Sequence, residues 1–343
     1  MDTDRRYQLQ SEAANRGIDA LLEHLQVPSQ AWRYYSEMLT TVLKMFEDGA
    51  DLGELKITNT ALKELRYGFK VFAPYRDVPK VTVFGSARTL PDDPISRQAQ
   101  AFARGMADAG WMVITGAGDG VMAAAQHGAG REQSFGLNIR IPWEQEANPV
   151  IADDAKLINF KYFFIRKLFF LKEAAAVCLF PGGFGTSDEA FEVFTLIQTG
   201  KTIVMPVVLV DVPGGQFWKT WEGFIVHEMV ERGLISPDDV HLFRLTDDPG
   251  VAAREILDFY RVFHSQRVVG DDVVLRLRRA LPAQTLSALE AQFEDLLHGQ
   301  AEQIQGPLAQ ESGEFPELVR LRFPAVRTNF GRLRLLIDAI NRS

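Results

Sequence analysis

The sequence predicts an α/β fold, a Rossmann-like parallel sheet with helices on both faces, flanked by N- and C-terminal helical extensions. Apolar runs of strand length alternate with helical stretches through the middle of the chain, and successive runs end in glycine. This alternation is typical of right-handed βαβ units, whose ligands bind at the carboxyl ends of the strands. We expect three segments, with limits at 1–78, 79–264 and 265–343.

The two flanking segments have a helical texture. Residues 1–72 are expected to be helical, with a break at 49–53, and helical spacing returns at 273–297 and 333–340. We expect the arginines of the last stretch to lie on a solvated helix face or at a subunit contact. These arginines are Arg320, Arg322, Arg327, Arg332 and Arg334.

The middle segment carries the strands and their glycine turns. The expected strands are 81–84, 111–114, 134–141, 174–180 and 203–210, with helices at 96–109, from 123 onward and at 189–199. Three of the strands end in glycine turns, at 85, 116–120 and 182–185. Because parallel strands place their carboxyl ends at one edge, these three turns are expected to converge there.

Composition excludes several classes of protein. The 343 residues are 46% hydrophobic and 24% charged, as in ordinary soluble globular proteins, and the net charge is −8. That charge argues against broad nucleic-acid binding. Cys178 is the single cysteine, so we expect no intramolecular disulfide and no cysteine metal site, and the six histidines show no metal-ligand spacing. With no N-terminal apolar signal core and no apolar run near the ~18–20 residues of a membrane span, we expect a cytoplasmic protein without membrane contact.

The most informative motif is P-G-G-F-G-T-S-D-E at residues 181–189. A glycine-rich turn between a strand and a helix can hold phosphate, since the backbone comes close and the free N–H groups of the helix start face the anion. Asp188 and Glu189 add negative charge that a pure phosphate grip does not need. A second interpretation is a capping box, in which Thr186 caps the helix and Glu189 returns to the cap, but it leaves the three glycines unexplained.

Two cations stand in an otherwise apolar helix. Arg166 and Lys167 interrupt the run 162–171, and burying them requires an anionic partner, which would be a phosphate or a carboxylate of the site. The alternative is a narrow polar stripe on the helix. His127, in the helix after the second glycine turn, is interpreted as an ordinary helix residue.

The turn 116–120 reads G-A-G-D-G, which matches the dinucleotide fingerprint only loosely, and Gly136 stands where that fingerprint has an acid. A nicotinamide cofactor is therefore not expected. A tight strand–helix turn explains these glycines by itself, while a nucleotide-binding edge remains open because the turn is one of three.

Together these residues resemble a known family. The motif 181–189 is similar to the P-G-G-x-G-T-x-x-E signature of the Lonely Guy (LOG) family, Arg166-Lys167 stands at the family's spacing before it, and the turn ending in Gly120-Val121-Met122 is also similar. The resemblance spans roughly residues 80–262. Such proteins have also carried the label lysine decarboxylase, which this sequence does not support, because no lysine stands in a recognisable pyridoxal-phosphate setting.

The resemblance implies a Rossmann-like fold and hydrolysis of the N-glycosidic bond of nucleoside 5′-monophosphates, AMP-like or cytokinin riboside monophosphates, to free base and ribose 5-phosphate. It implies catalytic roles for Arg166 and Glu189, no metal, no cofactor, and a homodimer or higher homo-oligomer. It carries the phosphate cradle over to Gly182, Gly183, Gly185 and Thr186. Ser86 and Arg88, at the end of the first strand, are candidate ribose or phosphate contacts. The other expected substrate or phosphate contacts are Gly116, Gly118, Gly120, Met122 and Lys167.

Two departures from the family pattern stand out. Ser187 and Asp188 replace the Leu-Glu of many members, and both flanking segments lie outside the minimal domain, resembling extensions of longer bacterial members.

Glu189 is expected to stabilise an oxocarbenium-like sugar and to orient or deprotonate water. Arg166 is open to three roles: binding phosphate, holding Glu189 ionised or assisting the leaving base. The alternative function is a non-catalytic nucleotide sensor or carrier; a DNA-processing module fits the net charge poorly.

Overall fold

The computed structural model describes residues 7–140, 146–324 and 329–343, and the chain divides into two compact units, Met1–Arg66 and Tyr67–Ser343. In the first unit α1 (Glu12–His24) is followed by α2 (Ser29–Glu47) and by most of α3 (Leu52–Phe72). The expected helices and the break near 49–53 are confirmed. The Ser11 side chain caps α1 by accepting a hydrogen bond from the backbone N–H of Ala14.

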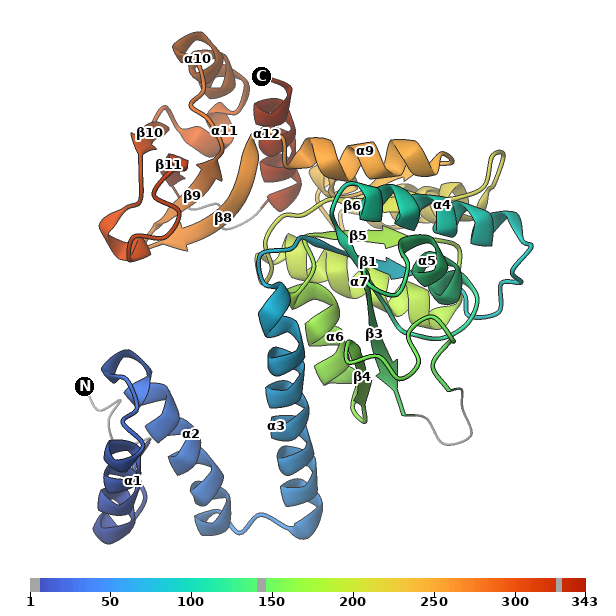
Figure 1. Ribbon diagram of the computed structural model, residues 1–343. Helices are drawn as coiled ribbons and strands as arrows, with labels where there is room; N and C mark the ends of the chain where they lie inside the picture. Colours follow the sequence, from blue (N-terminus) through green and yellow to red (C-terminus); the bar gives the residue numbers. More distant parts are fainter. Residues whose placement is uncertain (1–6, 141–145, 325–328) are drawn as a thin grey trace. The chain divides into compact units, whose positions relative to one another are not determined.

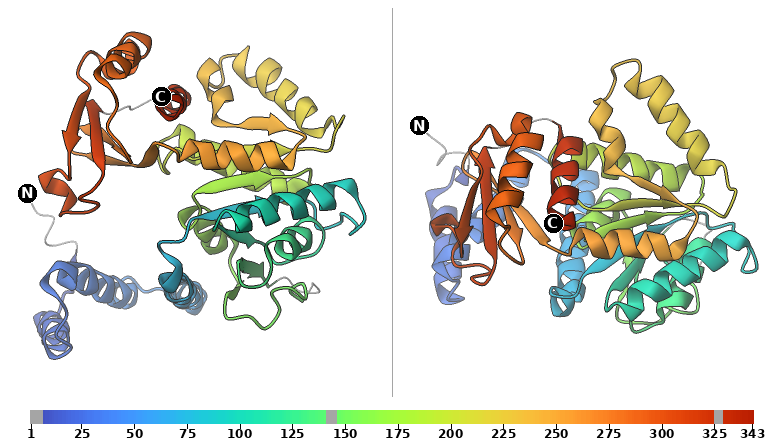
Figure 2. Two further views of the ribbon diagram at one scale, coloured as in Figure 1. Left: turned by 45° about the horizontal axis from the view of Figure 1, so that its top comes forward. Right: turned by 90° about the horizontal axis from the view of Figure 1, so that it is seen from above.

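The centre of the second unit is a seven-stranded parallel sheet in the order β4-β3-β2-β1-β5-β6-β7 (Figures 1 and 2). The predicted parallel sheet is confirmed, and two edge strands, β4 and β7, join the five that the sequence predicts. The strands are β1 (Lys80–Phe84), β2 (Met112–Thr115), β3 (Ser134–Ile139), β4 (Leu157–Phe160), β5 (Ala176–Leu179), β6 (Val207–Val210) and β7 (Arg244–Thr246). The central strands are buried along their length, as expected of a sheet covered on both faces.

Helices cover both faces of this sheet. The side chains of Val81 and Val83 pack into a core with α4, α5 and α9. On the opposite face, the Thr82 hydroxyl donates to the Phe170 carbonyl of α6 at 2.7 Å, as the period of two in a strand requires. The helices are α4 (Pro94–Asp108), α5 (Val121–Ala129), α6 (Phe163–Lys172), α7 (Phe184–Gln198), α8 (Phe217–Phe224), which continues into a π-helical turn (Ile225–Val230), and α9 (Pro249–Phe259).

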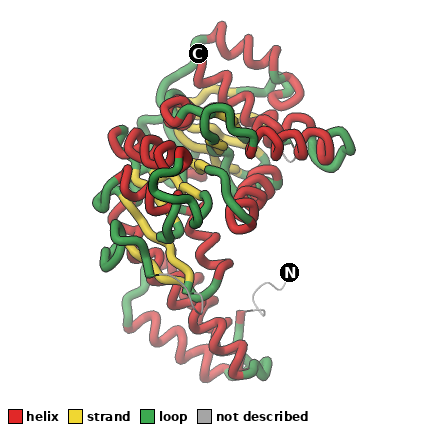
Figure 3. Tube along the Cα trace, turned by 90° about the vertical axis from the view of Figure 1, so that its right-hand side faces the viewer, coloured by secondary structure: helices red, strands yellow, loops and turns green. Residues whose placement is uncertain are grey.

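The C-terminal segment contains the expected helices and also a four-stranded antiparallel sheet, order β10-β11-β9-β8, whose strands are labelled in Figure 1. Figure 3 shows the helices of the chain in red and its strands in yellow. The expectation of helix over 273–297 is wrong at its start, where 273–277 belong to β9. That run is short and rich in valine and leucine, and pairing with β8 and β11 on both sides decides its conformation. The elements are β8 (Phe263–Val269), β9 (Asp272–Leu277), α10 (Ala283–Gln292), α11 (Glu294–Leu297), β10 (Glu302–Gln305), β11 (Val319–Pro324) and α12 (Phe330–Arg342).

The C-terminal arginines do not form the solvated face that the sequence suggests. Arg320 is fully buried and pairs with Glu311, while the buried Arg334 pairs with Glu255 and Asp338. Arg322 pairs at the surface with Glu302, and Arg332 with Asp295. Arg327 lies outside the described residues. No helix in the described part of the chain is both long and apolar enough to cross a membrane.

Candidate functional site

The candidate site lies at the point where the order of the strands in the sheet reverses. Along the chain, β2 to β4 are added on one side of β1, whereas β5 to β7 are added on its other side. Ligands of open α/β sheets bind outside the carboxyl ends of the strands at such a switch point. The turns that follow β1, β2 and β5 all leave the sheet at this edge, so the chain brings its three glycine turns to the position expected for a ligand.

Ser86 joins the three turns. Its backbone N–H donates to the Pro181 carbonyl at 3.1 Å, and its carbonyl accepts from the Val121 N–H at 3.0 Å. The turn after β1 is therefore hydrogen-bonded both to the 181–183 turn and to the start of α5. The predicted convergence of the three turns is confirmed.

The glycines of these turns fall into two groups. Gly120 has φ +63°, and a Cβ there would lie 2.3 Å from the Ser86 carbonyl oxygen. A Cβ on Gly182 would lie 2.2 Å from Thr186 Oγ1, and one on Gly116 would lie 2.8 Å from Met122 Sδ. Packing within the protein thus accounts for these three glycines.

Gly183 and Gly185 differ, because a Cβ at either would meet no atom within 4 Å. Gly183 is the N-cap of α7, and no side chain caps the helix. The first N–H groups of a helix have no partner within the helix, so those of α7 are available to an anion. This turn therefore combines open space for a ligand with free backbone N–H donors.

The capping-box interpretation of Thr186 is wrong. Helix α7 begins at Phe184, so Thr186 lies inside its first turn rather than at the cap, and its side chain is buried against Gly182. Glu189 accordingly does not return to a cap. Its carboxylate is directed to the neighbouring helix α6 instead.

Lys167 is the residue that Glu189 meets. The ammonium Nζ lies 3.2 Å from Glu189 Oε2, 2.8 Å from Asp188 Oδ2 and 2.7 Å from Glu192 Oε2. The interpretation of Lys167 as part of a polar stripe is thereby replaced by a paired cation between α6 and α7. Buried charges are tolerated when they are paired in this way.

Arg166 faces the second glycine turn. Its Nη1 lies 4.0 Å from the position that a Cβ on Gly116 would take, and its guanidinium lies over the rings of Phe163 and Phe170. Its Nε is buried without a hydrogen-bond partner. Within the described residues no carboxylate lies within 4 Å of this side chain, so Arg166 has donor capacity directed at the site.

Burial and charge act in opposite directions on these groups. Burial raises the pKa of Glu189 and outweighs the opposing effects of Lys167 and Arg166. Burial acts to lower the pKa of Lys167, but the contacts of its ammonium with the Asp188 and Glu192 carboxylates and the charge of Glu189 outweigh it, so that pKa is raised. Burial lowers the pKa of Arg166, against the charges of Glu189 and Asp188, and the guanidinium remains a cation.

Sequence reasoning missed Asn148. Its side-chain Nδ2 donates to the carbonyls of Ala117 and Gly118, both at 3.0 Å, and to Gln126 Oε1 at 2.6 Å. Ala117 has φ +62°, a conformation that costs energy for a non-glycine residue and is held here by the buried amide. A lone asparagine far from the turn carries no motif, so nothing in the sequence marks it.

The remaining candidates have ordinary surroundings. Cys178 is fully buried in β5, as the sequence indicates, and His127 is exposed on α5. The Gly118 carbonyl is held by Asn148, and the Ser86 hydroxyl accepts from the Arg88 N–H at 3.1 Å. Among the described residues, no group of three or more His, Cys, Asp or Glu side chains could hold a metal ion.

Comparison with solved structures finds low similarity. The molybdenum cofactor carrier protein of Chlamydomonas reinhardtii is 20% identical, with 52% of this chain and 98% of that chain covered and a TM-score of 0.37. The molybdenum cofactor binding protein of Rippkaea orientalis is 17% identical, covering 52% and 95%, with a TM-score of 0.37. The DNA processing protein A of Helicobacter pylori is 17% identical, covering 55% and 83%, with a TM-score of 0.38.

Comparison with curated proteins gives no significant match. Comparison with protein families does. Residues 118–256 match the family described as "Possible lysine decarboxylase", and this span includes α6, with Arg166 and Lys167, and the whole of the motif 181–189. Residues 118–256 thus form a domain that matches this family.

Proposed function

We propose that the protein hydrolyses the N-glycosidic bond of nucleoside 5′-monophosphates to give a free base and ribose 5-phosphate. The observation that carries this proposal is the position of Glu189. This buried carboxylate lies on α7 little more than one turn beyond the open N-terminus at Gly183 and Gly185, and Lys167 holds it. A phosphate at the helix start would position the ribose beside the carboxylate.

The phosphate binds at the start of α7. Its backbone N–H groups and the helix dipole favour an anion there, and the absence of side chains at positions 183 and 185 leaves room for it. Thr186 and Gly182 support the turn from inside, and Ser86 ties it to the neighbouring strand. We assign the second glycine turn, with Met122 and Arg166 at its side, to the base end of the substrate.

The reaction breaks the bond between C1′ of the ribose and the base nitrogen. As the bond lengthens, positive charge develops on the sugar, and the Glu189 carboxylate stabilises it. Water adds its oxygen to C1′ and gives one proton to Glu189. The base leaves with the bonding electron pair, its nitrogen takes up a proton from the solvent, and Glu189 releases its own proton to the solvent. Lys167 favours the ionised form of Glu189, and Arg166 stabilises negative charge on the departing base.

We also propose that the active protein is a homo-oligomer. Several phenylalanines around the site are exposed, among them Phe163 and Phe164 on α6, and Phe184 at the start of α7 is 97% exposed. Exposed aromatic groups of this kind are typical of surfaces that a partner covers. A second copy seated here would also exclude water from the substrate.

The test is incubation with a panel of nucleoside 5′-monophosphates, including AMP, GMP, CMP, UMP and a cytokinin riboside monophosphate, with chromatographic detection of free base. Glu189→Gln and Arg166→Ala are expected to lose base release by about 100-fold or more, the scale of one acid–base group. Glu132→Gln and Arg97→Ala, two exposed residues outside α6 and α7, serve as matched controls.

Wild-type protein that releases no base from any nucleotide yet binds one tightly would identify a nucleotide sensor or carrier instead. Near-normal turnover in both site variants would remove Glu189 and Arg166 from the mechanism.

A further inference from the structure

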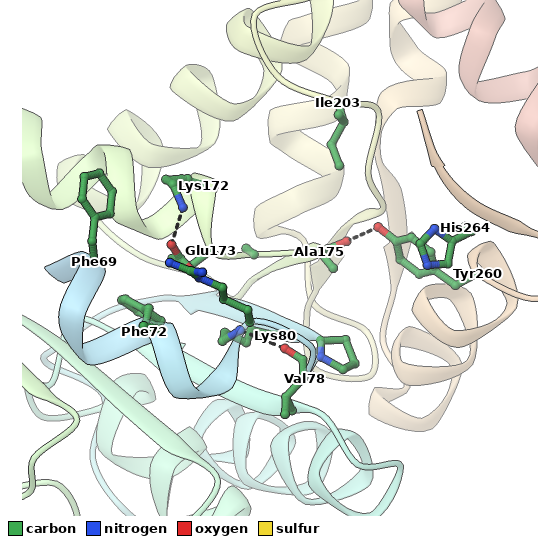
Figure 4. Close-up of a pocket in the computed structure, with 14 residues that line it drawn as sticks. Phe69, Phe72, Val78, Lys80, Lys172, Glu173, Ala175, Ile203, Tyr260 and His264 are labelled. Carbon is green, nitrogen blue, oxygen red and sulfur yellow. Dashed lines mark hydrogen bonds and ion pairs between the residues drawn. The ribbon is translucent and has the colours of Figure 1, made fainter. Parts of the chain in front are cut away.

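A cavity lies at the amino ends of the strands, on the edge of the sheet opposite the glycine turns. It has a volume of about 490 Å³ and is formed where residues 69–80 pass the starts of β5 and β8, near the amino ends of β1 and β5 (Figure 4). Its size is within the range of small-molecule sites, roughly 300–1,000 Å³. No residue of the glycine turns lines it, and the function proposed above does not use it.

Lys80 gives this cavity a buried positive charge. The residue is 2% exposed, and its ammonium donates to the carbonyls of Tyr75 at 2.6 Å and Val78 at 2.9 Å. In the described part of the chain, no carboxylate lies within 4 Å of this ammonium. The charges of Glu173 and Asp77 act on this ammonium only from a distance, and an anion in the cavity would stabilise it further.

Two further cations line the cavity. Arg76 is exposed at its rim, and Lys172 ends helix α6. Glu173 contributes a carboxylate, which Lys172 Nζ pairs at 2.6 Å. Three cations against this acid make the cavity positive in a chain whose net charge is −8. Such a local reversal of charge is what an anion-binding site requires.

The other walls are flat and apolar. Phe69, Phe72, Ile203 and Tyr260 face the cavity. The Tyr260 hydroxyl donates to the Ala175 carbonyl at 2.6 Å, which fixes the ring in place. Fixed aromatic rings are suited to contact with a planar group of a ligand.

We propose that this cavity binds a small organic anion of the nucleotide type, with a phosphate near Lys80, Arg76 and Lys172 and a planar base against Tyr260. The charge and the aromatic wall lie in one cavity, so neither phosphate alone nor a neutral nucleoside satisfies both. This site is independent of the function proposed for the glycine turns, and it stands or falls by binding rather than by turnover.

The test is isothermal titration calorimetry of the full chain with ADP, adenosine and inorganic pyrophosphate. The titrations use a Gly185→Glu background, which introduces a carboxylate into the open space at the start of α7 and repels anions from the first site. ADP is expected to bind at least tenfold more tightly than adenosine or pyrophosphate. No ADP binding, or equal binding of all three probes, would refute the proposal.

Variants then locate the binding. In that background, Arg76→Ala and Lys172→Ala are each expected to weaken ADP binding roughly tenfold, the typical scale of one charged contact. Glu173→Gln removes the cavity's acid and is expected to strengthen binding. Lys219→Ala, an exposed lysine on α8, is the matched control. None of these variants changes the buried Lys80, so a folding defect does not obscure the change in ADP affinity. Unchanged ADP affinity in both Arg76→Ala and Lys172→Ala would overturn the proposal.

Discussion

The ammonium of Lys167 on α6 lies 3.2 Å from the Glu189 carboxylate on α7, and it holds Asp188 and Glu192 as well. One lysine therefore links two adjacent helices and fixes the orientation of the carboxylate on which the proposed reaction depends. The arrangement also sets the charge of that carboxylate, because burial favours its neutral form and the lysine favours its ionised form. Both the activity and the stability of the site are expected to depend on this balance.

Lys167→Met is expected to raise the pKa of Glu189 further, since it removes the group that most strongly opposes the effect of burial. The ionised, active fraction of Glu189 then falls at a given pH. We expect kcat/KM at pH 6 to fall by about tenfold or more, and the acidic limb of the pH profile to move to higher pH. Lys161→Met, an exposed lysine just before α6, is the control; an unshifted acidic limb would argue against the link.

Glu189→Gln is expected to abolish activity without loss of stability. Since the folded-state pKa of Glu189 is raised, its contribution to stability is present below the unfolded pKa and is lost as pH rises through the folded value. As pH rises, the wild type increasingly carries a buried ionised carboxylate that the variant lacks. Thermal melts should show an equal or higher Tm for the variant at pH 7, with the difference smaller at pH 4. A clearly lower Tm at pH 7 would contradict this sign.

Two glycines of the site are expected to respond differently to alanine. Gly120→Ala places a Cβ 2.3 Å from the Ser86 carbonyl oxygen at a positive φ, so a loss of about 2–4 kcal/mol in unfolding free energy is expected. Gly183→Ala meets nothing within 4 Å and should melt like the wild type, while KM rises because the methyl group occupies the phosphate space. Denaturant titration and steady-state kinetics separate the two effects; equal stability of the two variants would contradict the steric argument.

Asn148→Ala is expected to release the second glycine turn. The change leaves the Ala117 and Gly118 carbonyls and the Gln126 amide oxygen without their shared donor, at a cost of about 1–3 kcal/mol. We expect KM to rise more than kcat falls, since the turn binds substrate in the proposed function. Asn138→Ala removes an exposed amide pair and should change the unfolding free energy by less than about 0.5 kcal/mol.

Glu311 is expected to be the main source of acid sensitivity in the C-terminal segment. Burial alone would raise its pKa, but hydrogen bonds from Arg320, the Leu308 N–H and Arg276 hold the pKa at about 2. Its stabilising contribution is therefore present above the unfolded value and is lost as pH falls toward 2. Glu311→Gln leaves the buried Arg320 uncompensated and should cost about 3–5 kcal/mol at pH 7.

The control for this prediction is Glu314→Gln. Glu314 pairs with Arg276 at the surface, so its loss should lower the free energy of unfolding by less than about 1 kcal/mol. Chemical denaturation at pH 7 and pH 3 measures both variants. A similar loss of unfolding free energy in both variants would show that burial does not decide how much each glutamate stabilises the protein.

Much of the fold follows from local patterns in the sequence. Alternating apolar runs and glycine turns predict the parallel sheet, and the spacing after residue 333 predicts α12. The pattern does not predict the conformation of 273–277, where a short segment with four apolar residues is compatible with helix or strand and only pairing with its two neighbouring strands decides. The expectation that Arg320 lies on a solvated face is wrong for the same reason, because its partner Glu311 comes into reach only when the chain folds back.

At the candidate site, local sequence patterns predict which residues carry charge, which turns lack side chains, and that three such turns follow parallel strands. The tertiary structure decided that Thr186 lies inside α7, that Lys167 rather than a helix cap engages Glu189, and that Asn148 supports the second turn. The sequence patterns have a short range, because helical or strand periodicity and turn preferences depend on only a few neighbouring residues. The partners of a buried charge, by contrast, are chosen by the order of strands and the packing of helices far apart in the chain.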